Sequence, residues 1–386
     1  MKLSSDDLPM FFTDAHRALG ERLRTAATRI EAVEQPGEHV TEAERDRAAA
    51  AALARAQLFE LVVPAAGRID TRAVCLAREM LGYVSARADS ILAVQGLGTH
   101  AIALAGSPDQ RAQLAAFVRG AGIAAFALTE PEAGSDVAAI STRATPSEDG
   151  LGYRLDGDKL FISNLGIADH ATVIATTDPA LGSRGLTAFW VPLDAPGVTV
   201  KPLQAIAAHP IGALELRGVV VPAAARIAEI GQGMKLAMQT LDAFRVSVGA
   251  AAVGMARRAL DEAIGFVTRR SQFGKLLAEQ PLVQAHLADM AVDLDAARLL
   301  VLRAAYAKDT EDRKVTTEVS IAKLGATEAA QRVIDRAVQL FGGRGVMAGA
   351  IVEQLYRAIR PLRIYEGTSE IQRTIIGRAL AQGGHP

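Results

Sequence analysis

The stretch VSIAKLGATEAAQRVIDRAVQL, residues 319–340 of a chain of 386 residues, is the clearest indication of how this protein folds. Its apolar residues recur at steps of three and four, which places them on one stripe of an α-helix. The stripe is formed by Val319, Ala322, Ala326, Ala329, Val333, Ala337 and Leu340. Because most of these side chains are small, two helices can approach closely along it. The pattern predicts a long helix packed in an antiparallel bundle.

A second stripe of the same period precedes the first. It is formed by Val283, Leu287, Met290, Leu294, Ala297 and Val301. Consecutive amphipathic helices are typical of a helix bundle, so we expect residues 226–386 to form a C-terminal four-helix bundle. Stripes of this kind usually only pack, and we assign them no chemistry.

The chain has a different texture before this bundle. Residues 1–120 are rich in Ala, Leu, Arg and Glu, and segments 48–58 and 71–86 are predicted helices of an N-terminal helical domain. Residues 121–225 hold short β-rich runs between turn residues, at 153–155, 159–162, 171–176, 185–191, 198–201 and 214–221. Asp156-Gly157, between two of these runs, predicts a tight hairpin. The expected architecture is a multidomain α+β fold with a β-barrel or sandwich as its middle domain.

Composition excludes several classes of protein. The chain is 50% hydrophobic and 22% charged, so it can bury a large core and is not disordered. Its 42 basic and 43 acidic residues give a net charge of −1, which provides no general attraction to nucleic acid or anionic membranes. The N-terminal residues lack a secretory signal pattern, and no apolar run of about 18 residues is free of charges. We expect a cytoplasmic protein without stable membrane association.

Neither a metal site nor a common nucleotide motif is indicated. Cys75 is the single cysteine, and none of the seven histidines lies three or four residues from another. Residues 96–101, GLGTHA, fit the dinucleotide-binding spacing, but their surroundings are helical and no acidic residue follows about 20 positions on. We interpret these glycines as a helix contact or break. A Walker loop and a G-x-S-x-G nucleophile elbow are absent.

Three segments carry residues suited to binding. Residues 126–136, FALTEPEAGSD, offer hydroxyls and backbone N–H groups that can hold a carbonyl, a ring nitrogen or a phosphate, with an ordinary turn as the alternative. Residues 269–275, RRSQFGK, form a basic cluster, and Gly274 would end a helix there. The cluster is either a cationic cap of that helix or a clamp for a pyrophosphate group. Residues 339–345, QLFGGRG, hold three glycines in four positions. A helix end explains one of them, which leaves close approach of a ligand or another backbone for the others.

A fourth segment, RIYEGTSEIQ at residues 363–372, is a polar interruption before the last predicted helix. On the residues alone, Glu366 fits two roles. It is a carboxylate that supports the positive end of a helix, or it is a catalytic group.

Taken in order, TEPEAGSD (129–136), RRSQFGK (269–275), QLFGGRG (339–345) and IYEGTSEIQR (364–373) resemble the motifs of the acyl-CoA dehydrogenase family. The resemblance runs from about residue 90 to the end and agrees with the helix–β–helix layout. It implies an FAD enzyme of fatty acid metabolism, usually a homotetramer built as a dimer of dimers. Such an enzyme oxidises a saturated acyl-CoA to the trans-2-enoyl thioester, and electrons pass to an electron-transferring flavoprotein.

The resemblance also implies roles for individual residues. The flavin would contact Phe126, Leu128, Thr129, Ser135, Phe161 and Ser163, and Ser135 would also meet the substrate. The FAD of a neighbouring subunit would contact Arg270, Phe273, Gln339 and Gly343. Thr368 and Glu370 would contact FAD near the base, and Asp242 and Arg245 would lie beside the CoA or acyl chain.

The resemblance places the catalytic base at one of two positions. One is the glutamate of the YEGT motif, here Glu366, and the other is the residue before the arginine of LDAFR, here Phe244. Phenylalanine cannot accept a proton, so the base should be Glu366. Removal of an α proton beside a thioester requires a positioned base and hydrogen-bond donors for the enolate oxygen. Gly367 would let the backbone approach the thioester carbonyl, with the Glu366 N–H as one donor and an FAD hydroxyl as the second.

Several residues depart from the common family pattern. Phe161 and Ser163 stand where Trp and Thr are frequent, residues 208–213 read AHPIGA, and Pro281 follows Gln280. These departures suggest a specialised acyl group. Three alternatives stay open: dehydrogenation of an acyl group on a carrier protein, flavin oxidase or monooxygenase chemistry, and a non-catalytic protein that keeps FAD.

Overall fold

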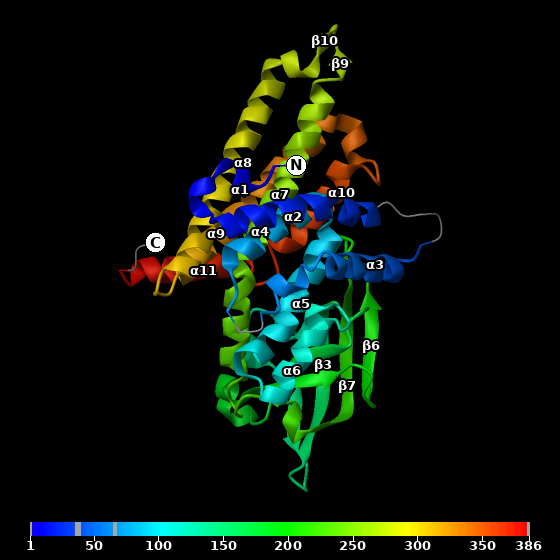
Figure 1. The fold of residues 1–386 in the computed structure, drawn as a ribbon, viewed down its shortest axis with the longest axis vertical. Helices are drawn as coiled ribbons and strands as arrows, with labels where there is room; N and C mark the ends of the chain where they lie inside the picture. Colours follow the sequence, from blue (N-terminus) through cyan, green and yellow to red (C-terminus); the bar gives the residue numbers. More distant parts are fainter. Residues whose placement is uncertain (1, 35–39, 65–67, 384–386) are drawn as a thin grey trace. The chain divides into compact units, whose positions relative to one another are not determined.

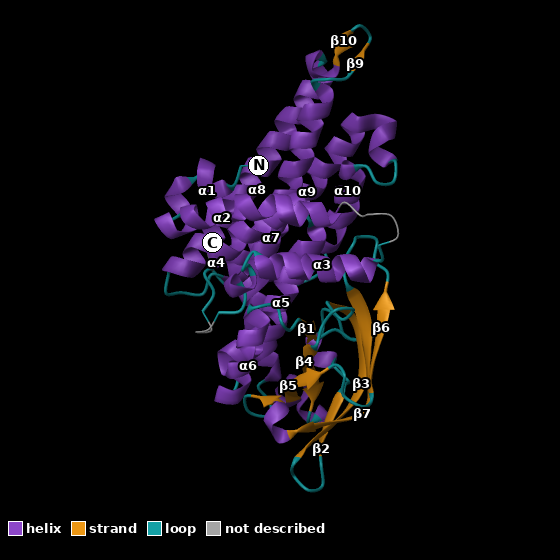
Figure 2. Ribbon diagram, turned by 45° about the vertical axis from the view of Figure 1, so that its right-hand side comes forward, coloured by secondary structure: helices purple, strands orange, loops and turns teal. Residues whose placement is uncertain are grey.

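The computed structural model describes residues 2–34, 40–64 and 68–383, and these residues form two compact units. The sheet unit comprises Ala32–Ile69 and Arg87–Phe244, and the bundle unit comprises Met1–Glu31, Asp70–Ala86 and Arg245–Pro386. Figure 1 shows strands β3, β6 and β7 in the colours of the middle of the sequence, with helices before and after them, and Figure 2 shows the strands in orange among the purple helices. The predicted sequence of helical, β and helical segments is therefore confirmed. The domain boundaries at residues 120 and 225 stay a prediction.

The sheet unit contains three helices besides the first part of α7. They are α3 (Glu42–Arg55), α5 (Ala86–Ala105) and α6 (Pro108–Val118). Helix α3 starts before the predicted segment because Thr41 and Glu44 form a reciprocal capping box at its N-terminus. On α5, a side chain at Gly96 would lie 2.5 Å from the ring of Phe244, and one at Gly98 would lie 2.7 Å from Ala124. The GLGTHA glycines are therefore helix contacts, as expected.

The eight-stranded sheet of this unit follows the order β6-β7-β3-β2-β4-β5-β8, with β1 paired in parallel to β4. Its strands are β1 (Ala124–Ala127), β2 (Arg143–Pro146), β3 (Gly152–Ser163), β4 (His170–Thr176), β5 (Leu186–Pro192), β6 (Val198–Leu203), β7 (Ile211–Pro222) and β8 (Arg226–Ile227). Strands β4 and β5 are buried along nearly their whole length, whereas buried and more exposed residues mix along β3 and β7. The core of the sheet includes Leu155, Val173 and Phe189.

The hairpin predicted at Asp156-Gly157 is wrong, because β3 runs through both residues as one strand. The pairing of β3 with β7 shifts between Leu155 and Gly157, so the two residues form an irregularity in the ladder. Gly157 has a φ of 155°, and a side chain there would lie 2.7 Å from the Thr142 backbone. The glycine is required for close approach of two chain segments rather than for a turn.

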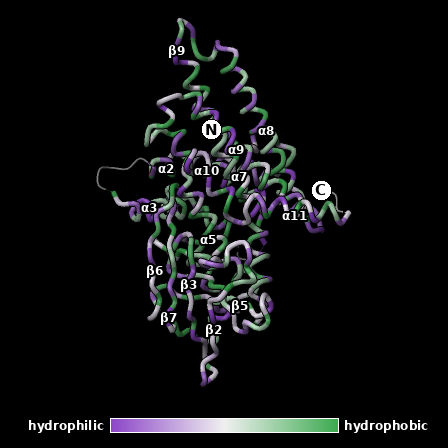
Figure 3. The backbone as a smooth tube through the Cα atoms, turned by 180° about the vertical axis from the view of Figure 1, so that it is seen from behind, coloured by the Kyte–Doolittle hydropathy of each residue, from purple (hydrophilic) through white to green (hydrophobic). Residues whose placement is uncertain are grey.

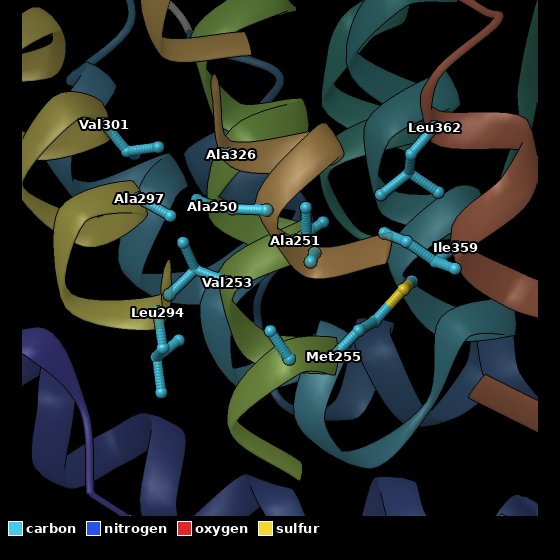
Figure 4. Packing of buried hydrophobic residues seen from close by; sticks show 14 of the residues in the cluster. Ala250, Ala251, Val253, Met255, Leu294, Ala297, Val301, Ala326, Ile359 and Leu362 are labelled. Carbon is cyan, nitrogen blue, oxygen red and sulfur yellow. The ribbon is translucent and has the colours of Figure 1, made fainter. Parts of the chain in front are cut away.

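The bundle unit is built from helices of four to 35 residues. They are α1 (Ser4–Asp7), α2 (Asp14–Glu31), α4 (Thr71–Val84), the second part of α7 (Gly233–Val267), α8 (Pro281–Thr310), α9 (Thr316–Phe341), α10 (Ile351–Leu362) and α11 (Ser369–Ala381). Both predicted stripes face the core, although Val283 and Leu287 at the start of α8 and Leu340 near the end of α9 are only half-buried. Figure 4 shows Val253 of α7 beside Leu294 of α8, and Met255 pointing toward Ile359 of α10.

Short 3-10 turns join these elements, at Pro9–Phe11, Ala32–Glu34, Phe59–Leu61, Val137–Ala139, Pro179–Gly185, Ala223–Ala225, Leu277–Glu279 and Gly342–Val346. Hydrophobic and hydrophilic residues interchange along the helices (Figure 3). Within the described ranges, no helix is both long enough and apolar enough to cross a membrane.

The expectation that Gly274 ends a helix is also wrong. Helix α7 ends at Val267, and the chain then forms a two-stranded hairpin of β9 (Ser271–Gln272) and β10 (Lys275–Leu276). Phe273 and Gly274 form its two-residue turn, with φ values of 55° and 73°. Two consecutive left-handed residues are the requirement of a type I′ turn, which explains the glycine.

One glycine of α7 tests how closely the bundle is packed. A side chain at Gly254 would lie 2.0 Å from the carbonyl oxygen of Glu79 on α4, so we expect Gly254→Ala to destabilise the protein by about 1–3 kcal/mol. Gly265→Ala on the same helix is the control, because its nearest neighbour would be the flexible Arg269 side chain at 3.5 Å. The control should be neutral or stabilising by about 0.5–1 kcal/mol. Urea unfolding of both variants gives the comparison, and equal stability of the two would contradict the packing described.

Candidate active site

Glu366 and Gly367 form a left-handed turn between α10 and α11, with φ values of 53° and 92°. Helix α11 begins only after Thr368, whose hydroxyl accepts the N–H of Ile371 at 3.3 Å. Glu366 therefore lies before the cap, and the first-turn carboxylate is Glu370. A non-glycine residue in this conformation costs about 1 kcal/mol or more and persists only where its surroundings enforce it. The surroundings therefore enforce this turn. Because Glu366 lies before the cap, stabilisation of the α11 N-terminus does not explain its presence there.

Three side chains hold the carbonyl oxygens of this turn. Arg245 of α7 donates Nε–H to the Glu366 oxygen at 3.1 Å, and Lys323 of α9 donates from Nζ to the Gly367 oxygen at 2.8 Å. The Gln372 amide donates to both oxygens, at 3.3 Å and 3.1 Å. Lys323 and Gln372 are fully buried, and Arg245 is nearly so. Charge-assisted hydrogen bonds in a dry site are strong, so the backbone at Glu366 is fixed.

The same turn is tied at its flanks. Glu328 of α9 accepts a hydrogen bond from the Ser369 hydroxyl at 2.6 Å and forms an ion pair with Arg363. Burial alone would raise the pKa of Glu328, but Ser369 and Arg363 lower it. The Glu328 carboxylate is therefore charged at neutral pH and secures both ends of the segment.

The predicted flavin residues of the sheet unit lie on two adjacent segments. Leu160 donates its N–H to the Thr129 oxygen at 2.9 Å, and Lys159 donates from Nζ to the Leu128 oxygen at 3.1 Å. These bonds bring the chain after β1 beside β3. Phe161 of β3 has a φ of 58° and is 62% exposed, which is unusual for an aromatic residue of a sheet. An exposed aromatic ring beside a hydroxyl-bearing segment suits a planar, partly polar ligand.

A buried ion pair fixes this second region. The Glu130 carboxylate accepts from Lys159 Nζ at 2.8 Å, from the backbone N–H groups of Ser141 and Thr142, and from the Ser141 hydroxyl. Burial opposes the charge on Glu130, but Lys159 and the other donors lower its pKa to about 2. Burial lowers the pKa of Lys159 to about 8 despite Glu130. Both groups are therefore charged at pH 7.

His209, which sequence reasoning did not select, contacts Ser163. Its Nε2 lies 2.7 Å from the Ser163 hydroxyl and its Nδ1 lies 2.7 Å from the Ser90 hydroxyl of α5. Burial and the nearby Arg87 lower the pKa of His209 to about 4, so the ring is neutral and has one donor and one acceptor nitrogen. This arrangement restricts the direction of the Ser163 hydroxyl. The only signal in the sequence was the unusual AHPIGA segment at 208–213.

The remaining predicted residues are placed as follows. Phe126 lies in β1, Leu128 is buried just after it, and Ser135 lies in the exposed turn that follows. Asp242 is half-buried on α7. The residues predicted to reach a neighbouring subunit are all exposed on the bundle unit: Arg270, Phe273, Gln339 and Gly343. In the part of the chain that the structure describes, no group of three or more His, Cys, Asp and Glu residues is arranged to hold a metal; His39 and His385 lie outside it.

Comparisons with known proteins agree on one family. The model described as "Acyl-CoA dehydrogenase, middle domain" matches residues 125–219, and "Acyl-CoA dehydrogenase, C-terminal domain" matches residues 231–381. A probable acyl-CoA dehydrogenase, FadE25 of Mycobacterium tuberculosis, is 40% identical over 315 residues, which are 81% of this chain and 80% of that protein. The human mitochondrial short-chain specific acyl-CoA dehydrogenase is 40% identical over 279 residues, covering 71% and 67%.

Solved structures show the same likeness over nearly the whole chain. Butyryl-CoA dehydrogenase from Megasphaera elsdenii matches with a TM-score of 0.88 and 32% identity, over 96% of this chain and 99% of that one. The chain is also similar to the structure titled "Crystal Structure of the Prolyl Acyl Carrier Protein Oxidase AnaB", with a TM-score of 0.83 and 26% identity, over 96% and 99%.

Proposed function

The chain belongs to the acyl-CoA dehydrogenase family of flavin-dependent oxidoreductases, and we propose that it converts an acyl-CoA to the trans-2-enoyl-CoA with Glu366 as the base. The observation that carries this proposal is the fixed left-handed turn at Glu366-Gly367. Nothing in ordinary helix packing requires that conformation, whereas a base must be held in one orientation.

In this proposal, Glu366 accepts the proton from the α carbon of the thioester. The turn is held through its carbonyl oxygens by Arg245, Lys323 and Gln372, so the backbone that carries the carboxylate does not have to order itself when substrate binds. Gly367 presents no side chain, and a Cβ there would lie 2.5 Å from the Gln372 amide. The Glu366 N–H is the proposed donor to the thioester oxygen, which gains negative charge as the proton leaves.

FAD is the proposed cofactor, and it supplies the acceptor for the hydride from the β carbon. Residues of the sheet unit suit the isoalloxazine ring: the exposed ring of Phe161, the hydroxyl of Thr129 and the oriented hydroxyl of Ser163. Phe126, Leu128 and Ser135 complete that proposed contact set. Thr368 and Glu370 are proposed to contact FAD near the base, and Asp242 and Arg245 to lie beside the substrate.

We also propose a homotetramer built as a dimer of dimers, in which each subunit contributes to a neighbour's FAD. The exposure of Arg270, Gln339 and Gly343, and the 97% exposure of Phe273, support this role. An electron-transferring flavoprotein is the proposed acceptor, and fatty acid metabolism and the cytoplasm are the proposed setting. Sedimentation and cell fractionation test the assembly and the location.

A second candidate is dehydrogenation of an acyl group carried by a carrier protein. It is favoured by the likeness to the prolyl acyl carrier protein oxidase structure, at 26% identity over nearly the whole chain. The reacting thioester is the same in both cases, and only the carrier beyond it differs.

Anaerobic bleaching of the bound flavin tests both candidates. The purified protein should be yellow and should bleach with at least one member of a panel of short, branched, cyclic and aromatic acyl-CoAs and acyl-carrier proteins. Bleaching by a carrier-bound substrate alone would select the second candidate. A colourless preparation that FAD cannot reconstitute would overturn the proposed function.

A further inference from the structure

Lys323 is a fully buried cation in the first half of α9. A lone ammonium group is costly to bury, so such a lysine is kept only where its charge or its hydrogen bonds are used. Its Nζ lies 2.8 Å from the Gly367 carbonyl oxygen, one residue after the proposed base. Burial lowers the pKa of Lys323 to about 8, which still leaves it charged at pH 7.

Four charged groups, on the turn, α7, α9 and α11, act on Lys323. Glu366 from the turn favours its charged form most, and Glu328 of α9 and Glu370 of α11 add smaller contributions. Arg245 of α7 opposes the charge. Glu328 also binds Arg363 and Ser369, and among the three carboxylates Glu366 favours the charge on Lys323 most.

We propose that Lys323 is a positioning residue for proton abstraction, which anchors the Gly367 carbonyl and supplies a positive charge that acts on the Glu366 carboxylate. This inference rests on the proposed function, because it assigns Lys323 to the same turn. The two contributions have one origin. The ammonium that donates to the backbone is also the positive charge that interacts electrostatically with the Glu366 carboxylate.

The anchoring contribution follows from the shape of the turn. Gln372 divides one amide group between two carbonyl oxygens, at 3.3 Å and 3.1 Å, whereas the bond from Lys323 is shorter and charge-assisted. Without Lys323, the Gly367 carbonyl keeps only the shared bond. Gly367 has a wide choice of backbone conformations, so the turn would lose its fixed form.

The electrostatic contribution has a definite sign. A nearby positive charge favours the ionised form of a carboxylate, so removing it should make Glu366 bind a proton at higher pH. The pH at which the bleaching rate falls to half on the acid side should therefore be about one unit higher in Lys323→Met than in the wild type. Lys323→Arg retains a charged donor, so this midpoint should lie close to its wild-type value.

The test compares flavin-loaded wild type, Lys323→Met and Lys323→Arg by anaerobic bleaching from pH 5 to pH 9, with the substrate that bleaches the wild type fastest. Arg332→Met is the matched control, because Arg332 lies on the same helix and pairs with Asp293 on α8. We expect Lys323→Met to bleach about 10- to 100-fold more slowly at pH 7, with little change in half-saturating substrate. The control should keep the wild-type bleaching rate and the wild-type dependence of that rate on pH.

A second readout does not depend on activity. Hydrogen exchange of peptides covering residues 363–372 should be at least about tenfold faster in Lys323→Met, since opening of the turn becomes easier, while peptides from residues 326–341 exchange as in the wild type. Wild-type exchange together with a wild-type pH profile in the folded variant would overturn the inference. If the wild type itself bleaches with no acyl thioester, the proposed function fails instead, and the exchange comparison still decides whether Lys323 holds the turn.

Discussion

Glu366→Gln is expected to keep its bound flavin and to slow anaerobic bleaching by an acyl thioester by about 10²- to 10⁴-fold. Glutamine has nearly the same shape but cannot accept the α proton. Arg245, Lys323 and Gln372 donate to the main-chain carbonyls of the turn, and these bonds remain available when glutamine replaces Glu366, so the turn should survive the substitution. The loss then reports the chemistry at Glu366 rather than a change in fold.

The acid limb of the pH profile gives this prediction a second measure. In the wild type, bleaching should fail at low pH because Glu366 becomes protonated, and the glutamine variant should lack that limb. Glu353→Gln on α10 is the matched control, since its carboxylate binds only the Gly349 N–H and Arg357 at the surface. A Glu366→Gln enzyme that bleaches at the wild-type rate would place the base elsewhere.

The two helical stripes could be predicted because one residue period determines both burial and secondary structure. Residues such as Ala326 and Val333 are fully buried as expected. The predictions made from Asp156-Gly157 and Gly274 were wrong for a different reason. A glycine signals an unusual backbone conformation, but the partner that requires it lies far along the chain. Thr142 approaches Gly157, and this contact is a product of the folded sheet.

The residues of the candidate site also fall into those that the sequence could predict and those that it could not. Glu366 and Gly367 are recognisable from their local motif, and the left-handed turn agrees with the glycine. The groups that hold the turn are not recognisable, because Arg245 and Lys323 reach it from positions 121 and 44 residues away. Lys323 lies within an alanine-rich helical segment whose pattern predicts only packing in a helix core. The same limit applies to His209, whose contacts come from two other elements.

Lys159→Met should destabilise the protein by about 3–5 kcal/mol, the usual cost of leaving one member of a buried ion pair without its partner. Lys159 is 1% exposed and Glu130 is 4% exposed, so the Glu130 carboxylate would keep its backbone donors but lose its counter-charge. Urea unfolding followed by circular dichroism measures the change. Lys201→Met is the control in the same sheet, because its ion pair with Glu215 is largely exposed and contributes about 0–1 kcal/mol.

The pH dependence of this variant separates charge from packing. With its folded pKa lowered to about 2, Glu130 stabilises the wild type fully above pH 4.5, and this contribution is lost as the pH falls from about 4.5 to 2. In Lys159→Met the carboxylate is buried without a cation, so it should take up a proton more readily in the folded state. The stability difference between variant and wild type should therefore shrink between pH 5 and pH 3. A constant difference across that range would mean that Lys159 acts by filling space, and that its charge contributes nothing to the segment carrying Thr129.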